Sequence, residues 1–413
     1  MSRRHIGSEV DRHRLHRRLD AAVCALGEQL GEQPPTPTMV VDLDAFDANA
    51  ADLVRRAGGK PVRVASKSLR VPALVSRALG SPGFAGVLSY SLREALWLAE
   101  RGVCDDIVLG YPSVDRAALS RLASDPGAAG SVTLMVDDVA HLDLIDEFRT
   151  PGGPTVRVAI DIDAGLRLGR AHVGPRRSPV YDVADVLALA DQVLDRPGFT
   201  LVGVMTYEGQ VAGVPDDVPG ARARSLVVRR MKSASVRQLD ERRQQVAQAL
   251  SGVVQLDFWN AGGSGSVESS VADPVVTEVS AGSGLLVPHL FDHYRSFAPR
   301  PAAFFGLRVA RRPGPGIATV AGGGLIASGA TGKDRSPVPW APPGLHLTGL
   351  EGAGEVQTPL VGPAASSLGI GDLVWFRHAK SGELAEHSRH VHLLSGDRIV
   401  DTVPTYRGTG NAW

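Results

Sequence analysis

Val62-Arg63-Val64-Ala65-Ser66-Lys67-Ser68 is the stretch that decides how the rest of the chain is interpreted. It begins with an apolar, β-rich run of the kind that forms a buried strand, and Lys67 follows directly at its carboxyl end. Residues at the carboxyl ends of the strands of a β/α barrel face the active site, so Lys67 is predicted to point into one. A lysine there suits covalent binding of an aldehyde, although an ion pair or a phosphate contact fits the same position.

This first run begins a series of apolar, β-rich runs that alternate with amphipathic stretches. Ser91–Glu100 is one such stretch, and its apolar spacing is typical of a helix packed on a sheet. Eight alternations at this spacing predict an α/β fold, a parallel (β/α)8 barrel, with an open doubly wound sheet as the structural alternative. The predicted strands are 62–66, 84–88, 106–110, 131–136, 156–162, 200–206, 254–258 and 275–280.

The chain on either side of the alternation has a different character. A helical pattern over residues 9–30 ends at a group of prolines, and a predicted strand begins at Thr38. Beyond residue 300, short strands broken by Gly and Pro replace the helical pattern. We expect an N-terminal helical arm over 1–37, the barrel over 38–299, and a mostly β C-terminal domain over 300–413 that the N-terminal strand joins.

One connection, residues 207–252, is much longer than the others. It contains the polar stretch Asp216–Arg230, followed by a predicted helix from about Ser235 to Leu250. Connections of that size over a barrel mouth usually have a function.

Composition excludes several classes of protein. The chain has 413 residues, of which 43% are hydrophobic, and its 44 basic residues balance 44 acidic ones. It contains no apolar run long enough to cross a bilayer, no signal core after its basic start, and no excess of positive charge for nucleic acid. Cys24 and Cys104 provide neither a disulfide framework nor a zinc cluster. We therefore expect a cytoplasmic protein without nucleic-acid or membrane partners.

Two loops of small residues follow the last two predicted strands, at Asn260–Ser266 and Ser280–Gly284. Their backbone N–H groups can approach a phosphate, and β/α barrels commonly bind phosphate at these two loops. A phosphorylated cofactor opposite Lys67 would account for both features. Other polar residues expected at strand ends around the same cavity are Tyr90, Asp137, Asp161, Asp163, Tyr207 and Asn260.

Along most of its length the sequence resembles the pyridoxal-phosphate enzymes of fold type III, in the branch of D-threonine aldolase and D-serine dehydratase. Thr36–Asp44 is similar to the first strand of that family, and Arg63–Arg70 to its lysine segment. Gly262–Ser266 resembles its Gly-Gly-Thr-Gly-Thr phosphate loop, and Thr277–Ser283 its Thr-Glu-x-x-x-Gly-Ser segment. Asp161–Gly169 is similar to its Asp-x-Gly-x-x-Arg-x-Gly strand end, with one residue fewer before the arginine.

The resemblance implies a pyridoxal 5'-phosphate cofactor that Lys67 holds as a Schiff base. It also implies an amino-acid substrate and a homodimer in which the second domain of one subunit completes the cavity of the other. Tyr207 matches the tyrosine of the family's Tyr-His-Gly strand end, with Glu208 in the histidine's place. The expected site residues are Lys67, His378 and Tyr207 for catalysis; Lys67, Arg167, Gly263, Ser264, Gly265, Ser266, Gly282 and Ser283 for the cofactor; and Arg177, Tyr406 and Arg407 for the substrate.

The sequence departs from the resemblance at the divalent metal that this branch ordinarily binds through a His-x-Cys or His-x-Asp pair. His378 is present, but Lys380 stands at the second position, where an ammonium opposes a dication. His390 and His392 lie on one face of a predicted strand and offer another pair, without a third ligand. We expect no metal, and expect His378, with Lys380, to do acid–base work on the substrate's β-hydroxyl.

The predicted function is that of a pyridoxal-phosphate-dependent lyase acting at the α-carbon of a small amino acid. Retro-aldol cleavage or dehydration of a β-hydroxy D-amino acid fits best, because the cofactor accepts the electrons of whichever bond the protein selects. Three alternatives stay open. One is a racemase with Tyr207 or Tyr406 as a second base, another is a non-catalytic pyridoxal-phosphate carrier, and the third is a sugar barrel in which Lys67 bonds a ketose.

Overall fold

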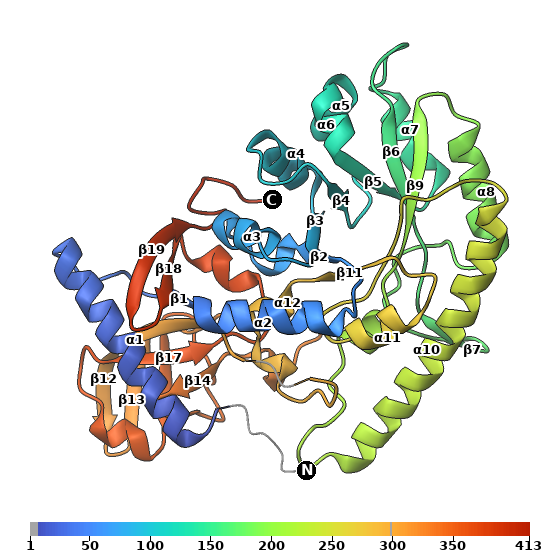
Figure 1. Ribbon diagram of the computed structural model, residues 1–413. Coiled ribbons are helices and arrows are strands. Elements are labelled where there is room, and N and C mark those ends of the chain that lie inside the picture. The colour runs from blue at the N-terminus through green and yellow to red at the C-terminus, as the bar shows by residue number, and fades with distance from the viewer. Residues whose placement is uncertain (1–6, 298–299) are drawn as a thin grey trace.

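The structure is a computed structural model that describes residues 7–297 and 300–413. It contains a closed barrel with helices around it and, beside the barrel, a separate domain that is mostly β-sheet (Figure 1). The predicted fold class is therefore confirmed. The predicted domain boundary at residue 299, and the first six residues of the predicted helical arm, lie outside the described residues.

The barrel consists of eight parallel strands in the order β10-β11-β2-β3-β4-β5-β6-β9. All five residues of β5 are buried, as expected of a parallel strand that is covered on both faces. The strands are β2 (Val62–Ala65), β3 (Phe84–Ser89), β4 (Ile107–Leu109), β5 (Val132–Val136), β6 (Val156–Asp161), β9 (Phe199–Thr206), β10 (Phe258–Ala261) and β11 (Glu278–Ala281).

The first and last barrel strands are joined inside the barrel by buried charges. Arg63 on β2 donates from Nε and Nη2 to the two carboxylate oxygens of Glu278 on β11, at 2.7 and 2.8 Å. Gly86 makes room for this arginine, because a Cβ there would lie 2.2 Å from Arg63 Nη1. A bidentate pair of this kind fixes the register between its two strands.

The last two strands lie further along the chain than predicted, at 258–261 and 278–281 instead of 254–258 and 275–280. The apolar run before Phe258 belongs to the connection, and pairing of Phe258 with Gly203 sets the register of β10. Asn260 is part of β10 and donates to Glu278 at 2.7 Å. A buried polar residue with such partners is compatible with a strand, which the apolar pattern alone does not reveal.

Helices cover the outside of the barrel, and α2 and α4 begin at side-chain caps of Asp42 and Ser91. The helices are α1 (Glu9–Leu30), α2 (Leu43–Arg56), α3 (Pro72–Leu79), α4 (Leu92–Glu100), α5 (Arg116–Ser124), α6 (Pro126–Ser131), α7 (Val139–Asp146), α8 (Val183–Leu194), α9 (Gly209–Ala212), α10 (Arg222–Ser251), α11 (Val267–Ala272) and α12 (Ser283–Leu286). The 3-10 turns are η1 (Ser66–Ser68), η2 (His289–Phe291), η3 (Lys333–Arg335), η4 (Pro363–Ser367) and η5 (Glu383–His387).

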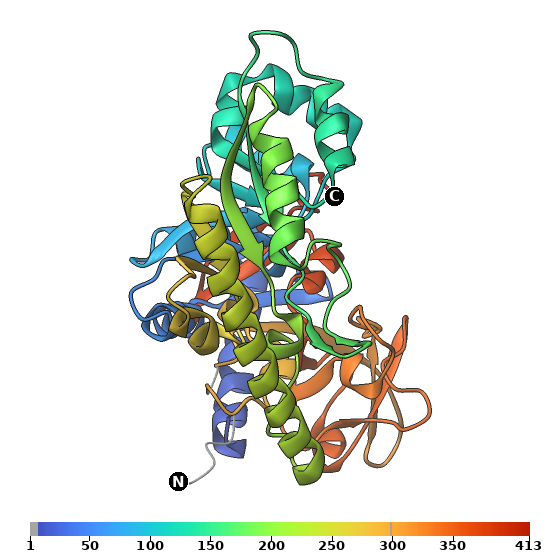
Figure 2. The same cartoon turned by 90° about the vertical axis from the view of Figure 1, so that its right-hand side faces the viewer.

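The long connection after β9 forms a helix earlier than predicted, because α10 begins at Arg222 instead of about Ser235. The first half of α10 contacts the rest of the protein through polar side chains. Lys232 Nζ pairs with Asp216 at 3.2 Å, and Ser235 Oγ accepts a 2.6 Å hydrogen bond from Gln210. An apolar periodicity does not reveal a helix that is held in this way. Figure 2 shows α10 running along the outside of the molecule.

The second domain is a nine-stranded sheet in which β1 lies between β12 and β18. The N-terminal strand thus pairs with strands from the far end of the chain, antiparallel to β12 and parallel to β18. The strands are β1 (Thr38–Asp42), β12 (Ala303–Gly314), β13 (Ile317–Ala321), β14 (Val338–Ala341), β15 (His346–Leu347), β16 (Gln357–Val361), β17 (Leu373–Arg377), β18 (His390–Ser395) and β19 (Arg398–Pro404); β7 (Leu166–Leu168) and β8 (Ala171–Val173) form a separate hairpin.

Helix α1 packs on this sheet and shares a small core with it (Figure 1). Leu19 and Val23 of the helix contact a cluster that includes Phe304 and Trp375. The Trp375 ring is fully buried, and its Nε1 donates to Asp20 Oδ1 at 2.7 Å.

Trp375→Ala should lower the free energy of unfolding by about 3–5 kcal/mol, because it leaves a cavity between α1 and the sheet. Denaturant unfolding measures the change. Val400→Ala, at an exposed position on β19, is the control and should change stability by less than about 0.5 kcal/mol. Equal effects of the two substitutions would contradict this account of the small core.

Candidate active site

A cavity of about 250 Å³ lies at the carboxyl ends of the barrel strands. The β domain contributes part of its wall through Arg335, Lys380 and Ser381. Of the residues predicted from the sequence, the cavity is lined by Lys67, Tyr90, Arg177, Tyr207, Asn260, Gly263, Ser264, Gly282 and Ser283. The central part of the predicted site is therefore assembled in one place.

Lys67 lies in η1, the short turn that directly follows β2. Its Nζ donates a 2.7 Å hydrogen bond to the hydroxyl of Tyr111. The sequence interpretation missed Tyr111, although a signal was present, since Tyr111 stands two residues after β4, at the carboxyl end of that strand. Lys67 is thus positioned by the strand that precedes it and by a tyrosine two strands away.

The two small-residue loops adjoin each other on the cavity wall. Gly284 N donates to Ser264 Oγ at 2.8 Å, and the hydroxyls of Ser68 and Ser283 lie 2.9 Å apart. A Cβ at position 282 would lie 2.4 Å from the carbonyl oxygen of Ala65, so only glycine lets this loop approach β2 so closely. The loops form a cradle of backbone and hydroxyl groups beside Lys67.

Two residues predicted for the cofactor lie behind this cradle. A Cβ at position 265 would lie 2.2 Å from the carbonyl oxygen of Ala212, so Gly265 packs closely on α9. Ser266 Oγ donates to Glu208 Oε1 at 2.9 Å. Neither residue lines the cavity. Both support the loop from below.

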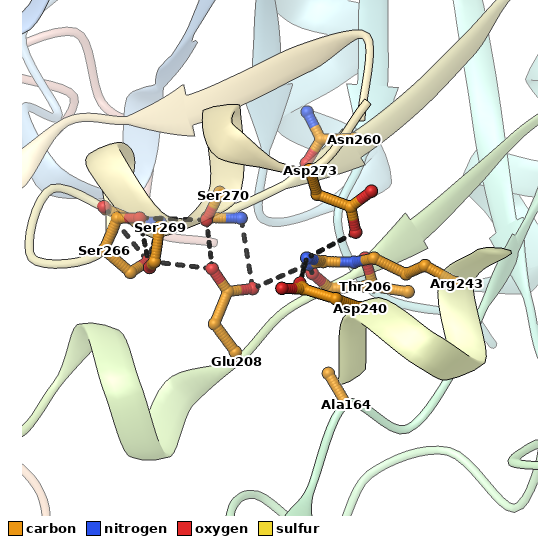
Figure 3. A network of polar contacts seen from close by, with 12 residues as sticks. Ala164, Thr206, Glu208, Asp240, Arg243, Asn260, Ser266, Ser269, Ser270 and Asp273 are labelled. Carbon is orange, nitrogen blue, oxygen red and sulfur yellow. Dashed lines mark hydrogen bonds and ion pairs between the residues drawn. The ribbon is translucent and has the colours of Figure 1, made fainter. Parts of the chain in front are cut away.

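A buried polar network holds the first loop in place (Figure 3). Glu208 is buried, and its carboxylate accepts hydrogen bonds from Gly262 N at 3.3 Å and from the hydroxyls of Ser266 and Ser270. Arg243 Nη2 lies 3.3 Å from Glu208 Oε2 and supplies the opposite charge. Glu208 therefore anchors the loop with an acceptor at the position where the family has a histidine.

Arg167 lies away from Lys67. Its side chain is half exposed, with the guanidinium carbon 3.4 Å from the centre of the Tyr181 ring and Nη2 3.8 Å from Asp163. It lines a neighbouring groove, and only Arg177 lines both that groove and the cavity. In the hairpin strand β7, Leu166 is buried whereas Arg167 and Leu168 are exposed, so the arginine lies on the outside.

His378 is buried behind the wall and does not line the cavity. Its Nε2 lies 3.1 Å from Ser381 Oγ. Burial, with help from neighbouring Arg377, lowers the pKa of His378 to about 3, so the imidazole is neutral at neutral pH. Lys380 and Ser381 face the cavity in its place, and Lys380 Nζ donates to Ser328 Oγ at 2.8 Å.

Tyr406 and Arg407 lie outside the cavity of their own chain. Tyr406 is buried, donates to Glu94 at 2.7 Å, and packs edge-on against Trp97. Arg407 pairs with Glu386 at 2.7 Å on the surface. Within one subunit their contacts are those of a structural C-terminal segment.

The residues of the expected metal position do not fit a dication. Lys380 lines the cavity, with its ammonium donating to Ser328, and Nδ1 of His392 is 2.9 Å from the hydroxyl of Thr402. Within residues 7–297 and 300–413, His, Cys, Asp and Glu form no group of three or more that could hold a metal ion. An ammonium therefore stands at the position where the resemblance implied a metal ligand.

The charged side chains on the described cavity wall are all positive. Its described lining carries four cationic side chains, Lys67, Arg177, Arg335 and Lys380, and no carboxylate. Burial and the nearby cations Lys67 and Arg335 lower the pKa of Lys380, while Glu383 acts in the opposite direction. Such an uncompensated wall favours ligands with several negative charges.

A barrel with a strand-end lysine and two adjoining small-residue loops defines the class of pyridoxal-phosphate enzymes of fold type III. Residues 41–288 match the family described as "Alanine racemase, N-terminal domain". This match covers more than half of the chain, and the chain belongs to that family. Membership confirms the resemblance from which the site residues were predicted.

Curated relatives include a D-threonine aldolase of Arthrobacter sp., which is 29% identical over 252 residues, 60% of this chain and 60% of the relative. A 3-hydroxy-D-aspartate aldolase of Paracoccus denitrificans is 29% identical over 182 residues, 43% of this chain and 44% of the relative. The matches thus span 60% or less of these relatives' lengths.

Solved structures with the same fold include D-threonine aldolase from Filomicrobium marinum, with a TM-score of 0.75 and 22% identity over 91% of this chain and 95% of that chain. Alanine racemase from Clostridium difficile 630 has a TM-score of 0.59 and 16% identity over 90% and 100% of the two chains. In the part of the chain that the structure describes, no helix is long and apolar enough to cross a membrane.

Glu208→Ala should destabilise the protein by about 3 kcal/mol, because it removes the acceptor of Gly262 N, Ser266 and Ser270 beneath the loop and one of the carboxylates that pair with the buried Arg243. Denaturant unfolding of the cofactor-free protein measures the change. Glu147→Ala is the matched control, since it removes an ion pair with Arg116 that is exposed on both sides, and should cost at most about 1 kcal/mol. A Glu208→Ala protein as stable as the control would show that the network contributes nothing.

Proposed function

We propose that the protein is a pyridoxal-phosphate-dependent lyase that cleaves or dehydrates a β-hydroxy D-amino acid. The observation that carries the proposal is the placement of Lys67 and both small-residue loops around one cationic cavity. The curated relatives, which are named as aldolases of such amino acids, support it. We also propose a cytoplasmic homodimer, in keeping with the two free cysteines and with the family resemblance.

The cavity fits pyridoxal phosphate. Lys67 would hold its aldehyde carbon covalently, and the loop residues Gly263, Ser264, Gly282 and Ser283 would surround its phosphate with N–H and hydroxyl donors. When bound, the cofactor supplies a sink for the electrons of a bond broken at the α-carbon. Tyr207 lies on the same wall, and burial raises its pKa to about 12, so it offers a neutral hydroxyl.

The remaining wall residues would orient the amino acid. Arg177 lines the cavity with its guanidinium 5.3 Å from the centre of the Tyr207 ring, and it would bind the substrate's carboxylate through two parallel hydrogen bonds. Lys67 would also be the candidate base for the α-proton. Lys380 and Ser381 line the same cavity and would contact the β-hydroxyl, and the neutral His378 would position Ser381 through their hydrogen bond.

Racemisation is the second candidate, since it needs a base on each face of the bound amino acid. Tyr207 lines the cavity and is available for that role, whereas the hydroxyl of Tyr406 is bonded to Glu94. The curated relatives, which are named as aldolases, favour the lyase.

Lys67→Ala should abolish both the visible absorption band of the protein-bound cofactor and the lyase activity, because Lys67 is the group proposed to hold the aldehyde. Lys60→Ala, which changes a lysine ahead of β2, should keep both. The assay uses D- and L-β-hydroxy amino acids and measures aldehyde and glycine for cleavage, and ammonia for dehydration. An absorption band that persists in Lys67→Ala contradicts the assignment of Lys67 as the residue that holds the cofactor. Inversion of the amino acid's configuration at the α-carbon, without these products, identifies a racemase.

Removal of divalent metal should leave activity unchanged, because Lys380 carries the positive charge next to the β-hydroxyl. The measurement compares turnover before and after a chelator, together with elemental analysis of the purified protein. One tightly held divalent ion per chain, with activity lost to the chelator and restored by the metal, would overturn the metal-free proposal.

A further inference from the structure

We propose that Tyr111 is the acid–base partner of Lys67. It takes a proton from Lys67 Nζ before the amine bonds to an aldehyde carbon, and returns that proton to the oxygen that leaves as water. The identity of the aldehyde, pyridoxal phosphate, rests on the proposed function. The hydrogen bond between Lys67 and Tyr111 does not, because it is present without any ligand.

The geometry singles out Tyr111. Its hydroxyl lies 2.7 Å from Lys67 Nζ, which is a direct path for a proton. This is the one hydrogen bond that Lys67 Nζ makes to the described residues. Tyr111 also lines the cavity, so its oxygen faces both the lysine and the space that the aldehyde would fill.

The groups around Tyr111 stabilise its phenolate. Lys67 approaches from η1, Arg177 from the loop before α8 with its guanidinium carbon 5.5 Å from the ring centre, and Lys380 from the β domain. Burial acts to raise the pKa of Tyr111, but these three cations outweigh it, and the pKa is lowered. The neighbouring hydroxyl of Tyr207 is uncharged.

Each of the other tyrosines of the wall lies near one cation, Arg177, Arg70 or Lys232, and the effect of burial prevails there. Burial raises the pKa of Tyr207 to about 12, and burial also raises the pKa values of Tyr90 and Tyr294. Four tyrosines therefore line one cavity, and the one bonded to the reacting lysine is the one whose charged form is favoured. A structural hydroxyl needs no such arrangement of cations.

The step balances in atoms and charge. The Nζ–H bond breaks and an Oη–H bond forms, which turns an ammonium and a phenolate into an amine and a phenol. The nitrogen lone pair then bonds to the aldehyde carbon. The aldehyde oxygen leaves as water with one hydrogen from Nζ and one from Tyr111, which returns Tyr111 to its phenolate and leaves a positive charge on nitrogen.

The first test uses the cofactor-free protein and does not depend on any activity. Ultraviolet difference spectra over a pH titration should show one of the six tyrosines ionising well below the others. That transition should vanish in Tyr111→Phe, and should move to higher pH in Lys67→Met and Lys380→Met. Tyr181→Phe, whose hydroxyl bonds Gln238 outside the cavity, should leave it unchanged. No early transition, or one that survives in Tyr111→Phe, overturns the proposal.

The second test follows the rate at which the cofactor-free protein takes up pyridoxal phosphate. Tyr111→Phe removes only a hydroxyl and should slow uptake about 100-fold, with recovery at higher pH, while Tyr181→Phe takes it up at the wild-type rate. Uptake by Tyr111→Phe at the wild-type rate and pH dependence overturns the role of Tyr111. If the wild type itself takes up none, the proposed function fails, and the tyrosine titration still decides whether Lys67 and Tyr111 share a proton.

Discussion

The buried pair of Arg63 and Glu278 is the interaction on which the site depends. It joins β2 to β11, and these two strands carry Lys67 and the second small-residue loop at their carboxyl ends. Asn260 of β10 donates to the same carboxylate, so the strand that leads to the first loop is tied to the same group. One carboxylate inside the barrel therefore fixes the register of the three strands whose ends form this part of the cavity.

The cavity combines two kinds of polar arrangement with opposite electrostatic balance. Below the first loop, Glu208 meets Arg243 and the hydroxyls of Ser266 and Ser270, and Asp240 and Asp273 also lie within 3.7 and 3.5 Å of Arg243, so carboxylates outnumber the cation there. On the wall itself the cations outnumber the anions in the described lining. The hydrogen-bonded network below fixes the loop, and the cationic wall above favours a ligand with negative charge.

Much of this organisation could be predicted from the sequence, for identifiable reasons. The barrel followed from the repetition of buried strands, and Lys67 and the small-residue loops followed from their places at strand ends. The register of β10 and the start of α10 could not be predicted, because hydrogen bonds of Asn260 and the ion pair of Lys232 replace the apolar pattern there. Arg167 and His378 matched family positions in sequence, but hairpin geometry and burial carry them away from the cavity wall.

The position of β1 between β12 and β18 has a consequence for how the chain is made. The ribosome releases β1 long before the strands that flank it, so one edge of this strand must stay unpaired until β12 has emerged and the other edge until β18 has emerged. The barrel strands are all complete by then, whereas the β1–β18 edge of the sheet closes only after Lys380 has been synthesised. The part of the cationic wall that Arg335 and Lys380 contribute thus forms after the barrel strands have been made.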